Sequence, residues 1–183
     1  MLSPLPHQVA EEPLKAAMRS ILAHGLEWLE KLLRWYIILL MALLVALTFI
    51  QVVARYAMSS PFTGTDQLAR IASVWLTFMG AAVAVWKNKN IRIEIIEQFL
   101  PNLLKKIMFL IFDILLIILL IVLSFKAYEV TEMGATQDII ATPFSYAVMY
   151  SSLFVGSVLM LLFVTLRALS RLGLLDMRFY QKD

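Results

Sequence analysis

One ionisable side chain interrupts a long apolar stretch of this sequence. Asp113 lies near the middle of the run 107–125, which is otherwise free of charge. A charge at the bilayer centre costs about 2.5–3.5 kcal/mol on insertion scales, so an acid kept there needs a function or a partner. The functional possibilities are an ion or proton relay, or a polar contact to another protein. The structural alternative is a protonated or hydrogen-bonded carboxyl facing a neighbouring helix, with Gln51, Ser73 or Thr77 as candidate partners.

A relay needs a second station, and no other predicted span carries an Asp, Glu, His, Lys or Arg in its interior. We therefore favour the structural role for Asp113. Other chemistry finds no support. There is no Cys for thiolate chemistry, and His7 and His24 lie outside the spans, which disfavours a haem-binding anchor. No nucleophile motif or metal motif is present, so we expect neither an enzyme nor a bound cofactor or metal.

The composition is that of a membrane protein. Apolar residues make up 61% of the 183 residues and charged residues 16%, with a mean hydropathy of +0.82. Soluble domains carry about 25% charged and about 45–50% apolar residues. The net charge of +3 does not argue for nucleic-acid binding, because the placement of the charges matters more than their total. The numbers argue against a soluble enzyme, a nucleic-acid-binding module and a disordered regulator.

Long charge-poor runs predict four membrane spans. A spanning helix needs about 20 mostly apolar residues, and helices satisfy their own backbone hydrogen bonds in lipid. We therefore predict an all-α integral membrane protein with a four-helix membrane domain over 35–170. Its spans lie at about 35–57, 66–86, 104–126 and 143–167.

The distribution of cations predicts the orientation. Thirteen of the 16 lysines and arginines lie in the N-terminal segment, in the loop between the second and third spans, and from Arg167 onward. Because positive charge favours the cytoplasmic side, we expect both termini there. The loop 126–142 then lies outside.

The segments flanking the membrane domain have their own patterns. We predict that residues 1–12 form a mobile tail and that residues 171–183 form a cytoplasmic tail. Residues 13–34 predict an amphipathic helix lying in the membrane surface, although a soluble flap or an extension of the first span stays possible. We expect membrane-surface anchors at Trp28, Trp35 and Trp86.

The second span carries a stripe of small residues. Ser73, Thr77 and Ala81 are four apart, and so are Gly80 and Ala84. Small residues let helices approach closely in lipid. The stripe predicts either packing inside this chain or docking on another subunit, and the sequence leaves both open.

Several stretches around the second span form a recognisable pattern. Arg55-Tyr56 ends the first span, Thr65–Arg70 precedes the second, and Val74–Ala81 reads VWLTFMGA. The polar stretch Asn88–Ile96 then leads to Leu100-Pro101. This pattern resembles the small membrane subunit of the tripartite ATP-independent periplasmic (TRAP) transporters of bacteria. The resemblance covers roughly residues 35–170 and is strongest over 55–101.

The resemblance implies a division of labour within a transporter of the bacterial inner membrane. A periplasmic binding protein would capture an organic anion, such as sialic acid or a C4-dicarboxylate. A large membrane subunit would carry the substrate and sodium sites and move like an elevator, as a symporter. The small subunit would pair tightly with it as a fixed scaffold, in contact with membrane lipids.

We accordingly expect a partner interface at Arg55, Asp66, Arg70, Ser73, Trp75, Thr77, Phe78, Gly80, Ala81 and Ala84. The external segments Phe62–Arg70 and Glu129–Pro143 are placed to meet the binding protein. An alternative function is a self-contained small homodimeric transporter that uses Asp113 for coupling. A membrane anchor of a redox complex is disfavoured, because the spans lack histidine.

Overall fold

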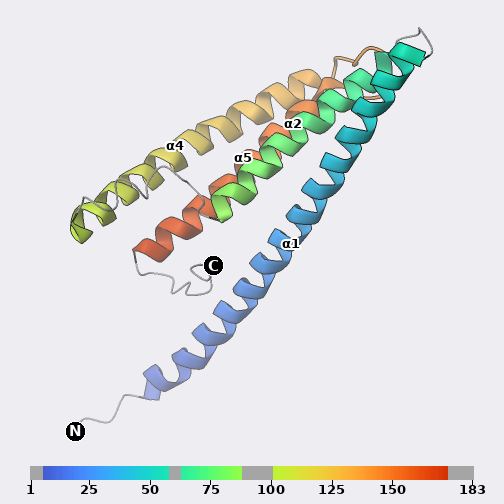
Figure 1. Ribbon diagram of the computed structural model, residues 1–183. Coiled ribbons are helices and arrows are strands. Elements are labelled where there is room, and N and C mark those ends of the chain that lie inside the picture. Colours follow the sequence, from blue (N-terminus) through green and yellow to red (C-terminus); the bar gives the residue numbers. More distant parts are fainter. Residues whose placement is uncertain (1–5, 58–62, 88–100, 173–183) are drawn as a thin grey trace.

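Four helices account for nearly all of the regular structure in the computed structural model. The structure describes residues 6–57, 63–87 and 101–172, with most side chains from His24 onward. The helices are α1 (Pro6–Ala57), α2 (Thr63–Trp86), α4 (Asn102–Gly134) and α5 (Tyr146–Arg171), as Figure 1 shows. Apart from helices, the described ranges hold one isolated bridge, between Asp138 and Ser145. The all-helical prediction is confirmed.

All four helices are long and apolar enough to cross a membrane. The candidate spans are His24–Tyr56, Gly64–Trp86, Ile107–Gly134 and Tyr146–Ser170. Each exceeds the length of about 20 residues that the hydrocarbon core requires. The predicted number of spans is therefore confirmed.

The third candidate span differs from the sequence expectation in its length. Helix α4 does not stop near Lys126 but continues to Gly134. Asp113 consequently lies about two turns from the start of the span Ile107–Gly134, not near its middle as we expected. The apolar part of this helix still ends at Lys126, so Asp113 keeps its place within the apolar run 107–125.

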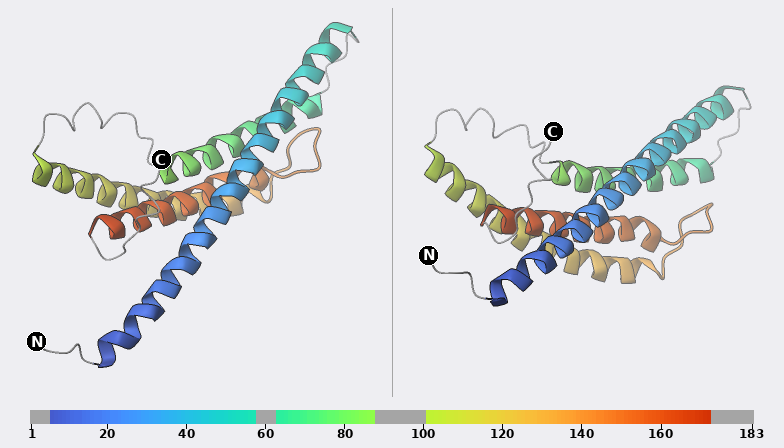
Figure 2. Two further views of the ribbon diagram at one scale, coloured as in Figure 1. Left: turned by 60° about the horizontal axis from the view of Figure 1, so that its bottom comes forward. Right: turned by 90° about the horizontal axis from the view of Figure 1, so that it is seen from below.

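The helices pack in a row. Helix α1 packs on α2, α2 on α5, and α5 on α4, and these are the three helix pairs with extensive contact within the described part of the chain. The views in Figure 2 show that the helices do not close into a bundle around a shared axis. One apolar cluster joins the first three helices of the row: Leu26 and Leu33 of α1, Met79, Ala82 and Trp86 of α2, and Phe163 of α5.

Helix α1 is continuous through the region where we expected a surface helix to give way to a span. It begins at Pro6, within the segment expected to be a tail, and runs to Ala57 as 52 helical residues. Segment 13–34 is thus continuous with the first span, which favours the alternative that it extends that span. Its position in the membrane surface stays a prediction. Figure 1 shows the N-terminal part of α1 leaving the other helices.

Some expectations fall on parts of the chain outside the described residues. These are residues 1–5 of the expected N-terminal tail, the stretch Asn88–Ile96, and residues 173–183 of the expected C-terminal tail.

Candidate functional site: buried polar contacts between the helices

The most buried polar contact in the described part of the chain joins α4 to α5. Arg167 Nη2 donates to Asp113 Oδ1 at 2.6 Å. Asp113 is 1% exposed and Arg167 is 4% exposed. This contact supports the favoured structural role of Asp113. The partner of its carboxylate is Arg167, however, and not one of the expected candidates Gln51, Ser73 and Thr77.

Arg167 was not considered as a partner of Asp113 because of its position in the sequence. It ends the charge-free run of the fourth span, so we assigned it to the cytoplasmic flank. The helix continues to Arg171, however, and Arg167 is buried within it. Because α4 and α5 are consecutive and antiparallel, the start of α4 lies beside the end of α5. Asp113 and Arg167 are therefore at the same depth.

Two further contacts hold α4 against α5 at other depths. The hydroxyls of Ser124 and Ser157 lie within hydrogen-bonding distance, 3.0 Å apart, and Ser157 is fully buried. Near the other end, a Cβ added at Gly134 would lie 2.7 Å from a ring carbon of Tyr150. The pair of helices is thus fixed by charge, by hydroxyls and by close packing along its length.

Helix α5 also approaches α2 closely. A Cβ at Gly156 would lie 2.7 Å from Phe78 Cβ and 3.3 Å from the Phe78 carbonyl oxygen. The indole N–H of Trp75 donates to the Val148 carbonyl at 2.9 Å. Phe78 and Trp75, expected at a partner interface, are therefore used within this chain. The sequence signal that identifies this contact is the pair of small residues Ser152 and Gly156, four apart on α5.

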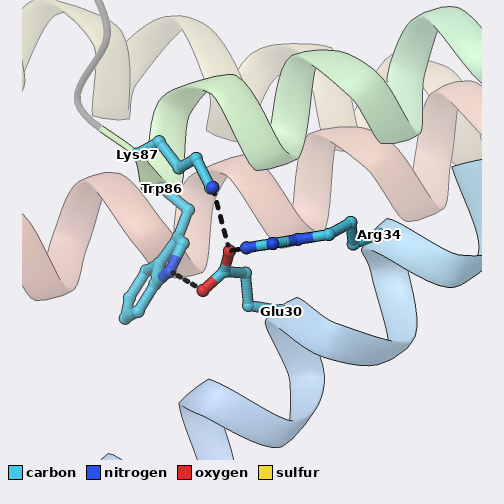
Figure 3. Close-up of polar contacts among 4 residues, drawn as sticks. All are labelled: Glu30, Arg34, Trp86 and Lys87. Carbon is cyan, nitrogen blue, oxygen red and sulfur yellow. Dashed lines mark hydrogen bonds and ion pairs between the residues drawn. The ribbon is translucent and has the colours of Figure 1, made fainter. Parts of the chain in front are cut away.

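A cluster around Glu30 ties α1 to the end of α2. Glu30 accepts hydrogen bonds from Arg34 Nη2 at 2.5 Å and from the Trp86 indole N–H at 3.2 Å, and Lys87 Nζ lies 3.4 Å away. Figure 3 shows the carboxylate with these three groups around it; Trp86 is the last residue of α2 and Lys87 directly follows it. Glu30, on α1, therefore binds residues at the end of α2 that lie 56 and more positions away in the sequence.

The three tryptophans expected as membrane-surface anchors have different surroundings. Trp28 and Trp35 are 65% and 70% exposed, as an anchor in contact with lipid must be. Trp86 is instead 7% exposed and packs against Phe163, with ring centroids 5.0 Å apart. An anchoring indole meets headgroups, whereas the Trp86 side chain is buried among neighbouring helices. That Trp86 anchors the chain at the membrane surface stays a prediction, which its burial does not favour.

The remaining interface candidates on α2 mostly face outward. Asp66 and Arg70 are exposed and form an ion pair of 3.7 Å, and Thr77 and Ala84 are exposed as well. A Cβ added at Gly80 would meet nothing within 4 Å. Two candidates on α2 are less exposed: Ala81, and Ser73, whose hydroxyl donates to the Arg70 carbonyl. Arg55, the candidate on α1, is exposed.

These contacts define the class of protein. Among the described side chains, no group of three or more His, Asp or Glu residues is placed to hold a metal ion. The charged groups buried between the helices bind one another. The fold and site are those of a multi-pass membrane protein whose helices are joined by internal polar contacts.

Comparison with known proteins places the chain within this class. Residues 44–173 match the family described as tripartite ATP-independent periplasmic transporters, DctQ component. The chain is 24% identical over 132 residues to a TRAP transporter small permease protein of Haemophilus influenzae, covering 72% of this chain and 80% of the relative. A second small permease protein of that organism is 33% identical over 101 residues, covering 55% of this chain and 60% of the relative.

A third relative carries a substrate in its name. The sialic acid TRAP transporter small permease protein SiaQ of Vibrio cholerae is 25% identical over 121 residues, covering 66% of this chain and 70% of SiaQ. This chain belongs to the DctQ component family of TRAP transporters. It is a small membrane subunit of such a transporter and a multi-pass protein of the bacterial inner membrane. The resemblance inferred from the sequence is thus confirmed.

Proposed function

We propose that this chain is the stationary scaffold subunit of a sodium-coupled TRAP transporter. It pairs with the large, moving membrane subunit, and both of its termini are cytoplasmic. The single observation that carries the proposal is the ion pair of Asp113 and Arg167, which uses a buried membrane charge to join two helices of the same chain. A subunit that moved solute or sodium would need such a charge to face the translocated species.

The packing of the helices supports a fixed rather than a moving role. Helices α4 and α5 are joined at several depths, and α5 approaches α2 closely at Gly156. Packed interfaces of this kind resist sliding, because each shift breaks close contacts and leaves polar groups unsatisfied. Such a unit offers a constant surface against which a larger subunit can move.

The outer face of α2 is the proposed docking surface for the large subunit. Thr77 and Ala84 are exposed there, and Gly80 faces open space. Small side chains allow a partner helix to approach closely, which is how helices associate in lipid. Gly80→Phe should therefore reduce co-purification of the large subunit. Ile118→Phe is the matched control, because Ile118 is an exposed position on α4.

The transported substrate is proposed to be an organic anion bearing a carboxylate, such as sialic acid or a C4-dicarboxylate. Support comes from the relative SiaQ, whose name specifies sialic acid. The anion would be delivered by a periplasmic binding protein and carried by the large subunit. This chain would contact neither the anion nor the sodium ions.

The alternative of a self-contained homodimeric transporter is less well supported. It requires Asp113 to change its partner during transport, yet the carboxylate is 1% exposed and bound by Arg167. Reconstitution distinguishes the two functions. Liposomes containing this chain alone should take up no anion, and uptake should require the large subunit and the binding protein. Uptake by the chain alone would refute the scaffold proposal.

A further inference from the structure

The loop between α4 and α5 has a defined backbone. The N–H of Ile139 donates to the Phe144 carbonyl at 2.9 Å, and that of Tyr146 to the Gln137 carbonyl at 2.9 Å. The N–H of Thr142 donates to the Ile139 carbonyl at 3.1 Å. Ile139 is 3% exposed. Two cross-loop hydrogen bonds, a turn and a buried side chain together hold this loop in one conformation.

The tip of the loop is fixed against the start of α2. Ala141 has a φ of 62°, in the left-handed region that residues with a Cβ rarely adopt. Its carbonyl oxygen lies so near α2 that a Cβ added at Gly64 would be 2.7 Å from it. Ile140, between the buried Ile139 and the strained Ala141, is held pointing outward and is 81% exposed.

The first charged side chains on α4 and α2, Lys126 and Arg70, are taken as the edge of the hydrocarbon core, which places Ile140 outside that core. The apolar part of α4 ends at Lys126, and the helix continues for about 12 Å to Gly134 at 1.5 Å per residue. Along α2, the distance from Arg70 to Gly64 is about 9 Å. The headgroup layer is about 5–8 Å thick on each side. The loop therefore stands at or beyond the outer edge of the headgroups, where a soluble protein can reach it.

The exposed charges that precede Ile140 in the chain are mostly negative. Lys126 is paired with Glu129 at 2.6 Å, and Arg70 with Asp66. Glu132 and Asp138 are exposed, and the structure gives neither of them an ion pair among the described side chains. The exposed apolar tip thus has two uncompensated carboxylates close to it in the chain.

We infer that Ile140, together with the acidic residues Glu132 and Asp138 that precede it in the chain, is the contact through which this chain receives the soluble binding protein. The matching surface on that protein is an apolar pocket bordered by Lys or Arg. The inference rests on the proposed function, because it requires the loop to lie on the periplasmic side. An exposed aliphatic side chain on a rigid loop loses little conformational entropy on binding, which favours affinity.

The test measures binding to the complex of this chain with the large membrane subunit in nanodiscs. The probe is the purified periplasmic binding protein, loaded with its anion. Ile140→Ser should weaken binding about tenfold, as loss of an apolar anchor does, and Ile140→Leu should restore it. Glu132→Lys combined with Asp138→Lys should slow association and reduce its salt dependence. Glu27→Lys is the matched charge control, because Glu27 is exposed at the opposite end of the membrane domain, and it should leave binding unchanged.

The outcomes separate this inference from the proposed function. If the unaltered complex fails to bind the probe, the proposed function fails. If the unaltered complex binds and Ile140→Ser binds equally well, the docking contact is wrong while the scaffold function stands. Co-purification of the large subunit with Ile140→Ser shows that the variant has folded and assembled. An unaltered affinity in that assembled variant would overturn the inference.

Discussion

Asp113 and Arg167 lie 54 residues apart in sequence and form a 2.6 Å ion pair between the third and fourth spanning helices. Each charge alone would be costly in a bilayer, but the two helices that carry them are consecutive. They can therefore enter the membrane together as a neutral hairpin. The pair also sets which turn of α4 lies beside which turn of α5, because a one-turn slip of about 5.4 Å would separate the charges.

Removing one member of this pair should be worse than removing both. Asp113→Leu leaves Arg167 buried beside an apolar side chain, and breaking a buried pair in this way costs about 3–5 kcal/mol. Asp113→Leu combined with Arg167→Leu should recover much of that loss. Thermal unfolding of the purified chain in detergent measures both variants. A double variant as unstable as the single one would contradict the prediction.

The glycines of α5 and α2 should respond oppositely to a methyl group. Gly156→Ala forces the new Cβ against Phe78 and should destabilise the chain by about 1–3 kcal/mol. Gly80→Ala, the matched control, meets open space and should stabilise α2 by up to about 1 kcal/mol through helix propensity. Midpoints of denaturation in detergent compare the two. Equal effects would mean that α2 and α5 are not in close contact.

The Glu30 cluster predicts a difference between two Trp→Phe substitutions. Trp86→Phe removes the indole N–H that donates a hydrogen bond to Glu30 and should lower the free energy of unfolding by about 1–2 kcal/mol. Trp28→Phe changes a side chain that is 65% exposed and should cost less than about 0.5 kcal/mol. The same denaturation assay measures both. Combining Trp86→Phe with Glu30→Gln should cost less than the sum of the two single changes, since both alter one contact.

The orientation of the chain can be determined with single cysteines, because the native sequence contains none. Ile140→Cys should react with a membrane-impermeant maleimide on intact cells. Glu27→Cys should react only after the membrane is permeabilised. The reverse pattern would place both termini outside and would remove the basis for docking at Ile140.

The four helices could be predicted from the sequence, since long apolar runs leave no other structure that satisfies the backbone in lipid. Their order in the row could not, because helices that are apolar on every side do not indicate which face packs on which neighbour. The close contact at Gly156 was overlooked for a related reason. Small residues occur on both α2 and α5, and only the packing shows which of them meet a neighbour.

The polar site was predictable in part. Asp113 stood out as the acid within a span, and a bonded carboxyl was the expected outcome. Its partner was missed because Arg167 ended a charge-free run and was counted as flank. The topology contained the missing information, since a hairpin brings the start of α4 beside the end of α5. The roles of Glu30 and Trp86 depend on how α1 crosses α2, which the sequence pattern does not specify.

Helix α1 is longer than the membrane is thick. Its 52 residues extend about 78 Å, against about 40–45 Å for a bilayer with its headgroups. A straight helix of this length must either emerge from the membrane or lean more than about 55° from its normal. In Figure 2 it crosses the other helices obliquely, and its N-terminal part lies away from them. In either case its N-terminal part extends beyond the other helices, and it can contact neighbours that never touch α2, α4 or α5.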